Sequence, residues 1–146
     1  MKKIILALCA LLLCVTAGCA KKQDVAFPIR SSFSFSAATD RFSLVLTEKN
    51  VIVTDNSGVL KQSLCFCFED NTLTYGTQCF PRTTDGVSVL TLGLLMRDLC
   101  TGNLSYEQNG HTLSGSYRSV PFTLRLCPSG EPEQLTWGGL TAEFET

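Results

Sequence analysis

The sequence predicts a mostly β domain of the α+β class: a curved antiparallel sheet (a half-barrel) with one helix packed across its concave face. Three observations predict this fold. Short segments alternate apolar and polar residues along most of residues 29–146, as strands with one buried face do. Turn-forming residues separate these segments at short intervals, so neighbouring segments can pair as hairpins. One longer segment, Val87 to Leu99, is apolar on nearly every side of a helix.

The first three strands are expected at Phe33–Ala37, Phe42–Leu46 and Val51–Val53. In the first of these, Phe33, Phe35 and Ala37 share one face and serines occupy the other. The third is a β-branched run, which suits a pleated surface. These strands predict one side of the sheet to be apolar.

The next hairpin can be given a register. A two-residue turn at Asp70-Asn71 would pair Phe68 with Leu73 and Phe66 with Tyr75. Its apolar residues would then share one face, whereas a slip of one residue would scatter them over both faces.

The second half of the chain contains two further tight turns. A turn at Asn109-Gly110 would pair Tyr106 with Leu113. A turn at Arg118-Ser119 would set three pairs, namely Tyr117 with Val120, Gly115 with Phe122, and Leu113 with Leu124. The closing strands are expected at Gln134–Trp137 and Leu140–Phe144, joined through Gly138-Gly139. Both hairpins place their apolar residues on one side, which predicts a continuous meander.

The helical candidate is Val87 to Leu99, with Asp85 as the expected N-cap. Its main apolar face consists of Leu92, Leu95, Met96 and Leu99, and its sides carry Val89, Leu90 and Leu94. A helix that is apolar almost all round must be covered on more than one side. We therefore expect it to lie across the apolar face of the curved sheet.

The N-terminus has the pattern of an export signal. Lys2 and Lys3 precede an apolar run, residues 4–15, that is too short to span a bilayer. The small residues that follow end in Gly18-Cys19, and this stretch resembles the lipobox of bacterial lipoproteins. The resemblance implies cleavage of residues 1–18 between Gly18 and Cys19, lipidation of Cys19, and a linker over residues 19–28. The alternative is an ordinary secretory signal with a coincidental cysteine.

This pattern predicts an extracytoplasmic protein anchored to the bacterial cell membrane through lipidated Cys19. The chain has 12 Lys and Arg against 13 Asp and Glu, and loss of Lys2 and Lys3 leaves 10 against 13. No basic stripe is present, which argues against nucleic acid as a partner. We expect Lys21 and Lys22 to form part of a solvated tether; the alternative is that they contact anionic headgroups.

The predicted domain resembles the LolA/LolB-like lipoprotein-carrier fold, and more closely small lipoproteins of this pattern in clostridia-like bacteria. Four stretches carry the resemblance: Phe33–Ala37, Leu64–Gly76, Val87–Leu99 and Leu113–Leu126. It implies a half-barrel with a helical lid and a concave apolar surface able to hold an acyl chain. A carrier of lipidated proteins should be soluble, whereas this chain is expected to be tethered through Cys19, so it would more resemble an acceptor or a membrane-proximal lipid-binding module.

From these patterns we expect non-enzymatic binding of a lipid or other hydrophobic ligand beneath the helix. The candidate cavity residues are Phe66, Tyr75, Leu92, Leu95, Met96 and Leu124. The alternative is a structural or protein-interaction module on the cell surface whose interior is filled by its own side chains. A free volume of several hundred Å³ would favour the ligand.

No enzyme motif is found in the sequence, and we expect no catalytic residue, cofactor or metal. His111, the one histidine, follows a predicted turn, where it would be exposed and without the partner that a general base needs. Trp137 either lines a ligand entrance or closes one end of the core.

Five cysteines follow Cys19: Cys65, Cys67, Cys79, Cys100 and Cys127. An odd number leaves at least one free thiol or an intermolecular bond. In the register above, Cys79 faces away from Cys65 and Cys67, and Cys127 approaches those two only if the sheet order allows. We expect most of these thiols to be unpaired; the alternatives are one disulfide or a zinc site with His111.

Overall fold

The computed structural model describes residues 32–81 and 88–145. The signal peptide, Cys19, the linker and the expected cap Asp85 lie outside these ranges. The described elements are β1 (Ser32–Ala37), β2 (Asp40–Leu46), β3 (Asn50–Asp55), β4 (Gln62–Cys67), β5 (Thr72–Tyr75), β6 (Gln78–Pro81), α2 (Val89–Cys100), β7 (Tyr106–Asn109), β8 (Thr112–Tyr117), β9 (Val120–Leu126), β10 (Pro132–Trp137) and β11 (Leu140–Phe144).

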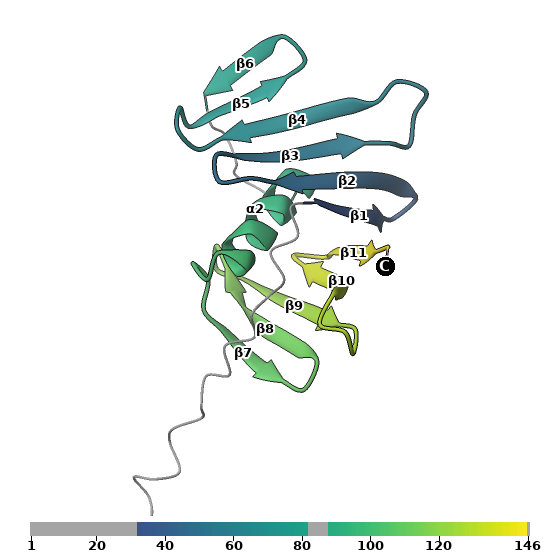
Figure 1. The fold of residues 1–146 in the computed structure, drawn as a ribbon, viewed down its shortest axis with the longest axis vertical. Helices are drawn as coiled ribbons and strands as arrows, with labels where there is room; N and C mark the ends of the chain where they lie inside the picture. Colours follow the sequence, from purple (N-terminus) through teal and green to yellow (C-terminus); the bar gives the residue numbers. More distant parts are fainter. Residues whose placement is uncertain (1–31, 82–87, 146) are drawn as a thin grey trace, which may run out of the picture.

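All eleven described strands form one antiparallel sheet in the order β6-β5-β4-β3-β2-β1-β11-β10-β9-β8-β7. Strands that follow each other in the chain are neighbours, except that β1 pairs with β11 and the helix separates β6 from β7. The pairing of β1 with β11 joins the two halves into one sheet, whose free edges are β6 and β7 (Figure 1).

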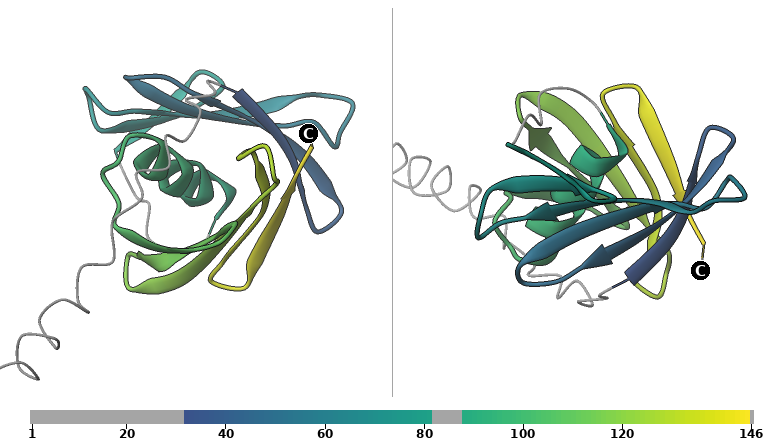
Figure 2. Two further views of the ribbon diagram at one scale, coloured as in Figure 1. Left: turned by 60° about the horizontal axis from the view of Figure 1, so that its bottom comes forward. Right: turned by 90° about the horizontal axis from the view of Figure 1, so that it is seen from above.

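The sheet bends around α2, so the helix lies on its concave side, between the two halves (Figure 2). The predicted fold class is therefore confirmed: a curved antiparallel sheet with one helix on its concave face. The helix is covered as its composition requires, since every residue from Leu90 to Met96 is buried.

The core is built from alternate residues of the strands and from the helix. Its largest fully buried side chains are Trp137, Phe35, Phe66, Leu44, Leu92, Leu95, Met96, Leu113, Leu124, Leu135 and Val51. Each such side chain contributes roughly 1.5–3 kcal/mol through removal from water. Phe33, Phe35 and Ala37 share the buried face of β1, as predicted.

Gly93 sets the distance between helix and sheet. A Cβ atom at this position would lie 2.9 Å from both Leu44 Cδ1 and Val51 Cγ1, and 3.4 Å from Val53 Cγ2. A glycine inside a helix costs about 1 kcal/mol relative to alanine. Here it lets the helix backbone approach β2 and β3 directly.

The start of the helix differs from the expectation. Ser88 is the N-cap, and its hydroxyl accepts a hydrogen bond from the Thr91 backbone N–H at 3.2 Å. The helix begins at Val89 and extends to Cys100, so the prediction of Asp85 as cap was wrong. Serine and aspartate both satisfy an N-terminal N–H, and the pattern of the sequence did not distinguish them.

Two hairpin registers also differ, each by two residues. Phe66 pairs with Leu73 and Leu64 with Tyr75, because the β4–β5 connection is a four-residue loop with Asn71 at a φ of 53°. The longer loop leaves Phe68 outside the β4–β5 ladder. Its ring packs edge-on against the Phe66 ring, with the two ring centres 4.8 Å apart. A shift of two keeps every side chain on its predicted face.

The β7–β8 hairpin shows the same effect. Its turn is Gly110-His111, so Tyr106 pairs with Gly115 and Leu113 with Gln108. Gly110 has a φ of 59° and stands at the first turn position, where a type II′ turn requires glycine. Asn109 is therefore the last residue of β7 and not a turn residue.

The remaining predicted turns are confirmed. Arg118 and Ser119, with φ of 51° and 64°, join β8 to β9 in the predicted register. Gly138 and Gly139 join the closing strands β10 and β11.

Candidate ligand-binding cavity

A cavity of about 450 Å³ lies between the first turn of α2 and the concave face of β2 to β5. Most of its lining is apolar and comes from both layers. The lining residues are Phe42, Val53, Asp55, Gln62, Leu64, Leu73, Tyr75, Ser88, Val89 and Leu90.

The cavity exists because the helix begins part of the way across the sheet. Strand alternation directs Val53 and Asp55 of β3, and Gln62 and Leu64 of β4, to the concave face. Helical packing on that face starts only at Val89. Among the described residues, no helical side chain covers the apolar strand residues beyond this point, and a space remains.

Polar groups gather at the rim. The Tyr75 hydroxyl donates a hydrogen bond to Gln62 Oε1 at 2.5 Å. Asp55 accepts one from the Ser57 backbone N–H at 2.8 Å. Hydrogen bonds from Ser57 hold the pKa of the Asp55 carboxyl below its usual value of 3.8, so the group is anionic at neutral pH. The cavity therefore combines an apolar interior with a polar, negatively charged rim.

The structure separates the six predicted cavity residues. Tyr75 lines the cavity and is 39% exposed. The other five, which are Phe66, Leu92, Leu95, Met96 and Leu124, belong to the packed core and are at most 1% exposed. The centre of the helix is thus filled by side chains, and the free space lies at its N-terminal end.

Sequence reasoning missed Phe42, Val53, Leu64 and Leu73 as lining residues. Their alternation identified the correct face of the sheet. Their position relative to the helix N-terminus, which only the tertiary structure defines, separates them from the core residues of the same strands.

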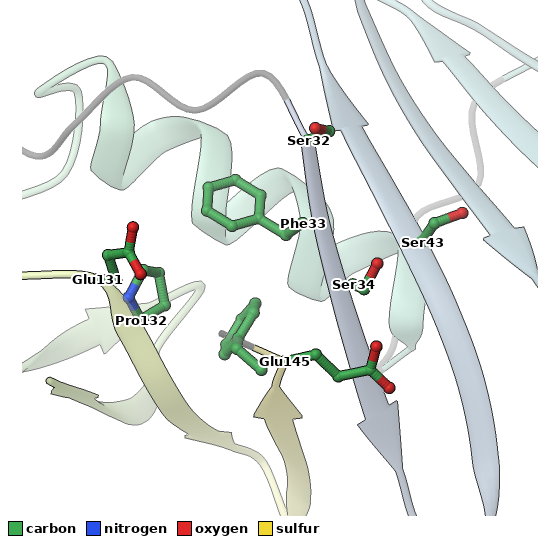
Figure 3. A pocket seen from close by; sticks show the side chains of 8 residues that line it. Ser32, Phe33, Ser34, Ser43, Glu131, Pro132 and Glu145 are labelled. Carbon is green, nitrogen blue, oxygen red and sulfur yellow. The ribbon is translucent and has the colours of Figure 1, made fainter.

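A second cavity of about 340 Å³ lies where β11 ends and β1 faces the start of β10 (Figure 3). It is lined by Ser32, Phe33, Ser34, Ser43, Glu131, Pro132, Phe144 and Glu145. In Figure 3 the Phe33 ring lies between β1 and the start of β10. Because serines and glutamates form much of the lining, this cavity suits an apolar ligand less well than the first.

The five cysteines of the described ranges are all free thiols. Cys79 pairs with Thr74, which also pairs with Cys65, so the three residues form one row across β6, β5 and β4. The prediction that Cys79 faces away from Cys65 was wrong, because the chain reverses at Gly76 and β5 does not continue to residue 79. The β5 strand still separates the two thiols.

The other cysteines are also isolated. Cys127 follows β9, which five strands separate from β4. Burial raises the pKa of Cys100 to about 11. Within residues 32–81 and 88–145, no three His, Cys, Asp or Glu side chains are grouped as metal ligands.

His111 and Trp137 both have structural roles and lie outside the two cavities. His111 is exposed in the β7–β8 turn, where its carbonyl accepts a hydrogen bond from the Leu126 N–H at 2.8 Å. Trp137 is 1% exposed, and its indole N–H donates to the Tyr117 carbonyl at 3.2 Å. Trp137 therefore closes the core and lines neither cavity.

None of the helices in the part of the chain that the structure describes has the length and apolar character needed to cross a membrane. Comparison with known proteins found no matching family model, no matching curated protein and no matching solved structure.

Proposed function

We propose that this protein is a membrane-anchored extracytoplasmic lipoprotein that binds a lipid or another hydrophobic ligand without catalysis. The supporting observation is the cavity of about 450 Å³ with its apolar lining. Small-molecule sites typically occupy about 300–1,000 Å³ and combine apolar walls with a few polar groups. The resemblance to lipoprotein carriers is part of the same proposal, and it suggests an acyl chain as the ligand of this cavity.

The energetics are sufficient for a ligand of moderate affinity. A chain that buries ten methylene groups gains roughly 8 kcal/mol on transfer from water. That gain corresponds to a Kd of about 1 μM before the cost of association is subtracted. We therefore expect micromolar or weaker binding, which suits a ligand that is exchanged.

Binding is tested with the neutral apolar dye N-phenyl-1-naphthylamine, by fluorescence, and with native mass spectrometry for co-purified lipid. Leu73→Trp would fill the cavity from β5 and is expected to abolish dye binding. Thr74→Trp adds the same side chain to the opposite face of the strand and should leave binding intact. Circular dichroism checks that both variants fold.

Two results would contradict ligand binding: no dye or lipid bound to the parent protein, or equal loss of binding in both tryptophan variants. The interior would then serve only as a core, and the rival proposal of a structural or protein-interaction module on the cell surface would take its place. The tight packing around Leu92, Leu95 and Met96 is the observation that favours this rival.

The membrane location rests on the basic, apolar and small-residue order that ends at Cys19. Two acyl chains on one cysteine anchor a protein stably, whereas a single chain binds reversibly. In bacteria labelled with radioactive palmitate, the parent chain should carry label and sediment with membranes, and Cys19→Ser should do neither. An unlabelled, secreted parent chain would indicate an ordinary signal peptide.

A further inference from the structure

We infer that the cavity selects long-chain ligands whose head group donates hydrogen bonds, an ammonium first and a hydroxyl second, and disfavours those that end in a carboxylate. This inference rests on the proposed function and adds the chemical class of the ligand. It depends on the charge at the rim of the cavity and on the hydrogen-bond donors and acceptors there.

The charge on the lining of the cavity is negative only. Asp55 is the one charged side chain among the described lining residues, and no lysine, arginine or histidine accompanies it. Arg41 is the nearest cation along β2, but it alternates with the lining residue Phe42 and is exposed on the other face. Nothing among the described lining residues therefore neutralises a bound carboxylate.

The dipole at the N-terminus of α2 favours a bound anion, but its effect is weaker than that of the Asp55 carboxylate. This dipole is equivalent to about half a positive charge, and it attracts anions. Asp55 carries a full negative charge, and the Ser88 hydroxyl already satisfies the N–H of Thr91. The net field at the rim is expected to be negative.

Hydrogen-bond acceptors also predominate at the rim. The Tyr75 hydroxyl donates its hydrogen to Gln62 Oε1, so the Tyr75 oxygen can only accept a further hydrogen bond. Asp55 has Oδ1 bonded to the Ser57 N–H, and its second oxygen offers further acceptor sites. The Gln62 amide NH₂ is the main donor that remains. An ammonium or hydroxyl group can satisfy these acceptors, whereas a carboxylate offers only more acceptors.

The test compares three ligands of equal chain length, which are dodecylamine, dodecanol and dodecanoate. Each is used below its aggregation limit at pH 7, by displacement of N-phenyl-1-naphthylamine from the full-length protein. We expect the amine to bind best, the alcohol next, and the carboxylate at least tenfold more weakly than the amine.

Asp55→Asn isolates the charge. An asparagine side-chain oxygen can still accept the Ser57 N–H, so the loop geometry should be kept. The variant should reduce the preference for amine over carboxylate severalfold. Glu143→Gln, which removes an exposed carboxylate on β11 outside the cavity, should leave the preference unchanged.

The inference is overturned if dodecanoate displaces the dye as well as dodecylamine does, or if Asp55→Asn and Glu143→Gln change the preference equally. Either result would leave the proposed function standing, because ligands would still bind. Failure of the dye itself to bind would remove the proposed function and this inference together.

Discussion

The Arg97 guanidinium lies 3.7 Å from the centre of the Phe68 ring. Arg97 belongs to the last turn of α2, and Phe68 to the loop between β4 and β5. The same guanidinium donates to the Glu48 carbonyl in the β2–β3 turn at 3.3 Å. One helical side chain thus fastens two loops of the sheet to the helix, at the end opposite the cavity.

Arg97→Ala should lower the free energy of unfolding by roughly 1–2 kcal/mol, because it removes a partly buried cation–π contact and a charged hydrogen bond. Chemical denaturation measures the change. In a double-mutant cycle with Phe68→Leu, a coupling of about 0.5–1 kcal/mol is expected. Zero coupling would mean that the ring and the guanidinium are merely adjacent.

Gly93→Ala should destabilise the protein by roughly 1–3 kcal/mol, although alanine is the better helix former. Its Cβ would lie 2.9 Å from side-chain atoms of both Leu44 and Val51. Thermal unfolding tests this, and Val51→Ala in the same chain should recover part of the loss by making room. A more stable Gly93→Ala variant would show that the helix is not in close contact with β3.

The thiols should differ in reactivity toward iodoacetamide at pH 8. Cys79 is exposed on edge strand β6 and should be labelled in the native protein. Burial raises the pKa of Cys100 to about 11, so little of the reactive thiolate forms and labelling should require unfolding. Peptide mass spectrometry distinguishes the two sites. Equal labelling of both in the native state would contradict the position of Cys100 beside the core.

Tyr117 should make the protein sensitive to alkali. Burial, with a smaller contribution from the neighbouring Asp98 carboxylate, raises the pKa of its hydroxyl above the ordinary value of 10.0. The unfolded chain therefore loses this proton at lower pH than the folded chain does. The stabilisation is complete below pH 10 and is lost as the pH rises through the folded-state value.

Tyr117→Phe supplies the comparison for that prediction. Its free energy of unfolding should fall less steeply above pH 10 than that of the parent protein, measured by urea denaturation at each pH. Identical slopes would assign the alkaline loss to other groups, such as Cys65 and Cys100, whose pKa values burial also raises.

The faces of the strands followed from the sequence alone. Apolar residues at alternate positions, as in Phe33 and Phe35, must point to one side of an extended chain. The predicted faces are correct although two predicted hairpin registers were wrong. Each predicted register differs from the observed one by two residues, and a shift of two leaves every side chain on the same face of the sheet. The need to cover a helix that is apolar all round likewise predicted its place inside the curve.

Tertiary structure decided the points at which segments begin and end. The sequence could not tell that the helix starts after Ser88, that the chain reverses at Gly76, or that Phe68 leaves the ladder to pack beneath Arg97. Local propensities near such points differ by about 1 kcal/mol or less, and packing between distant residues outweighs them. The cavity depends on one of these boundaries, because it lies between the first turn of the helix and the apolar face of the sheet.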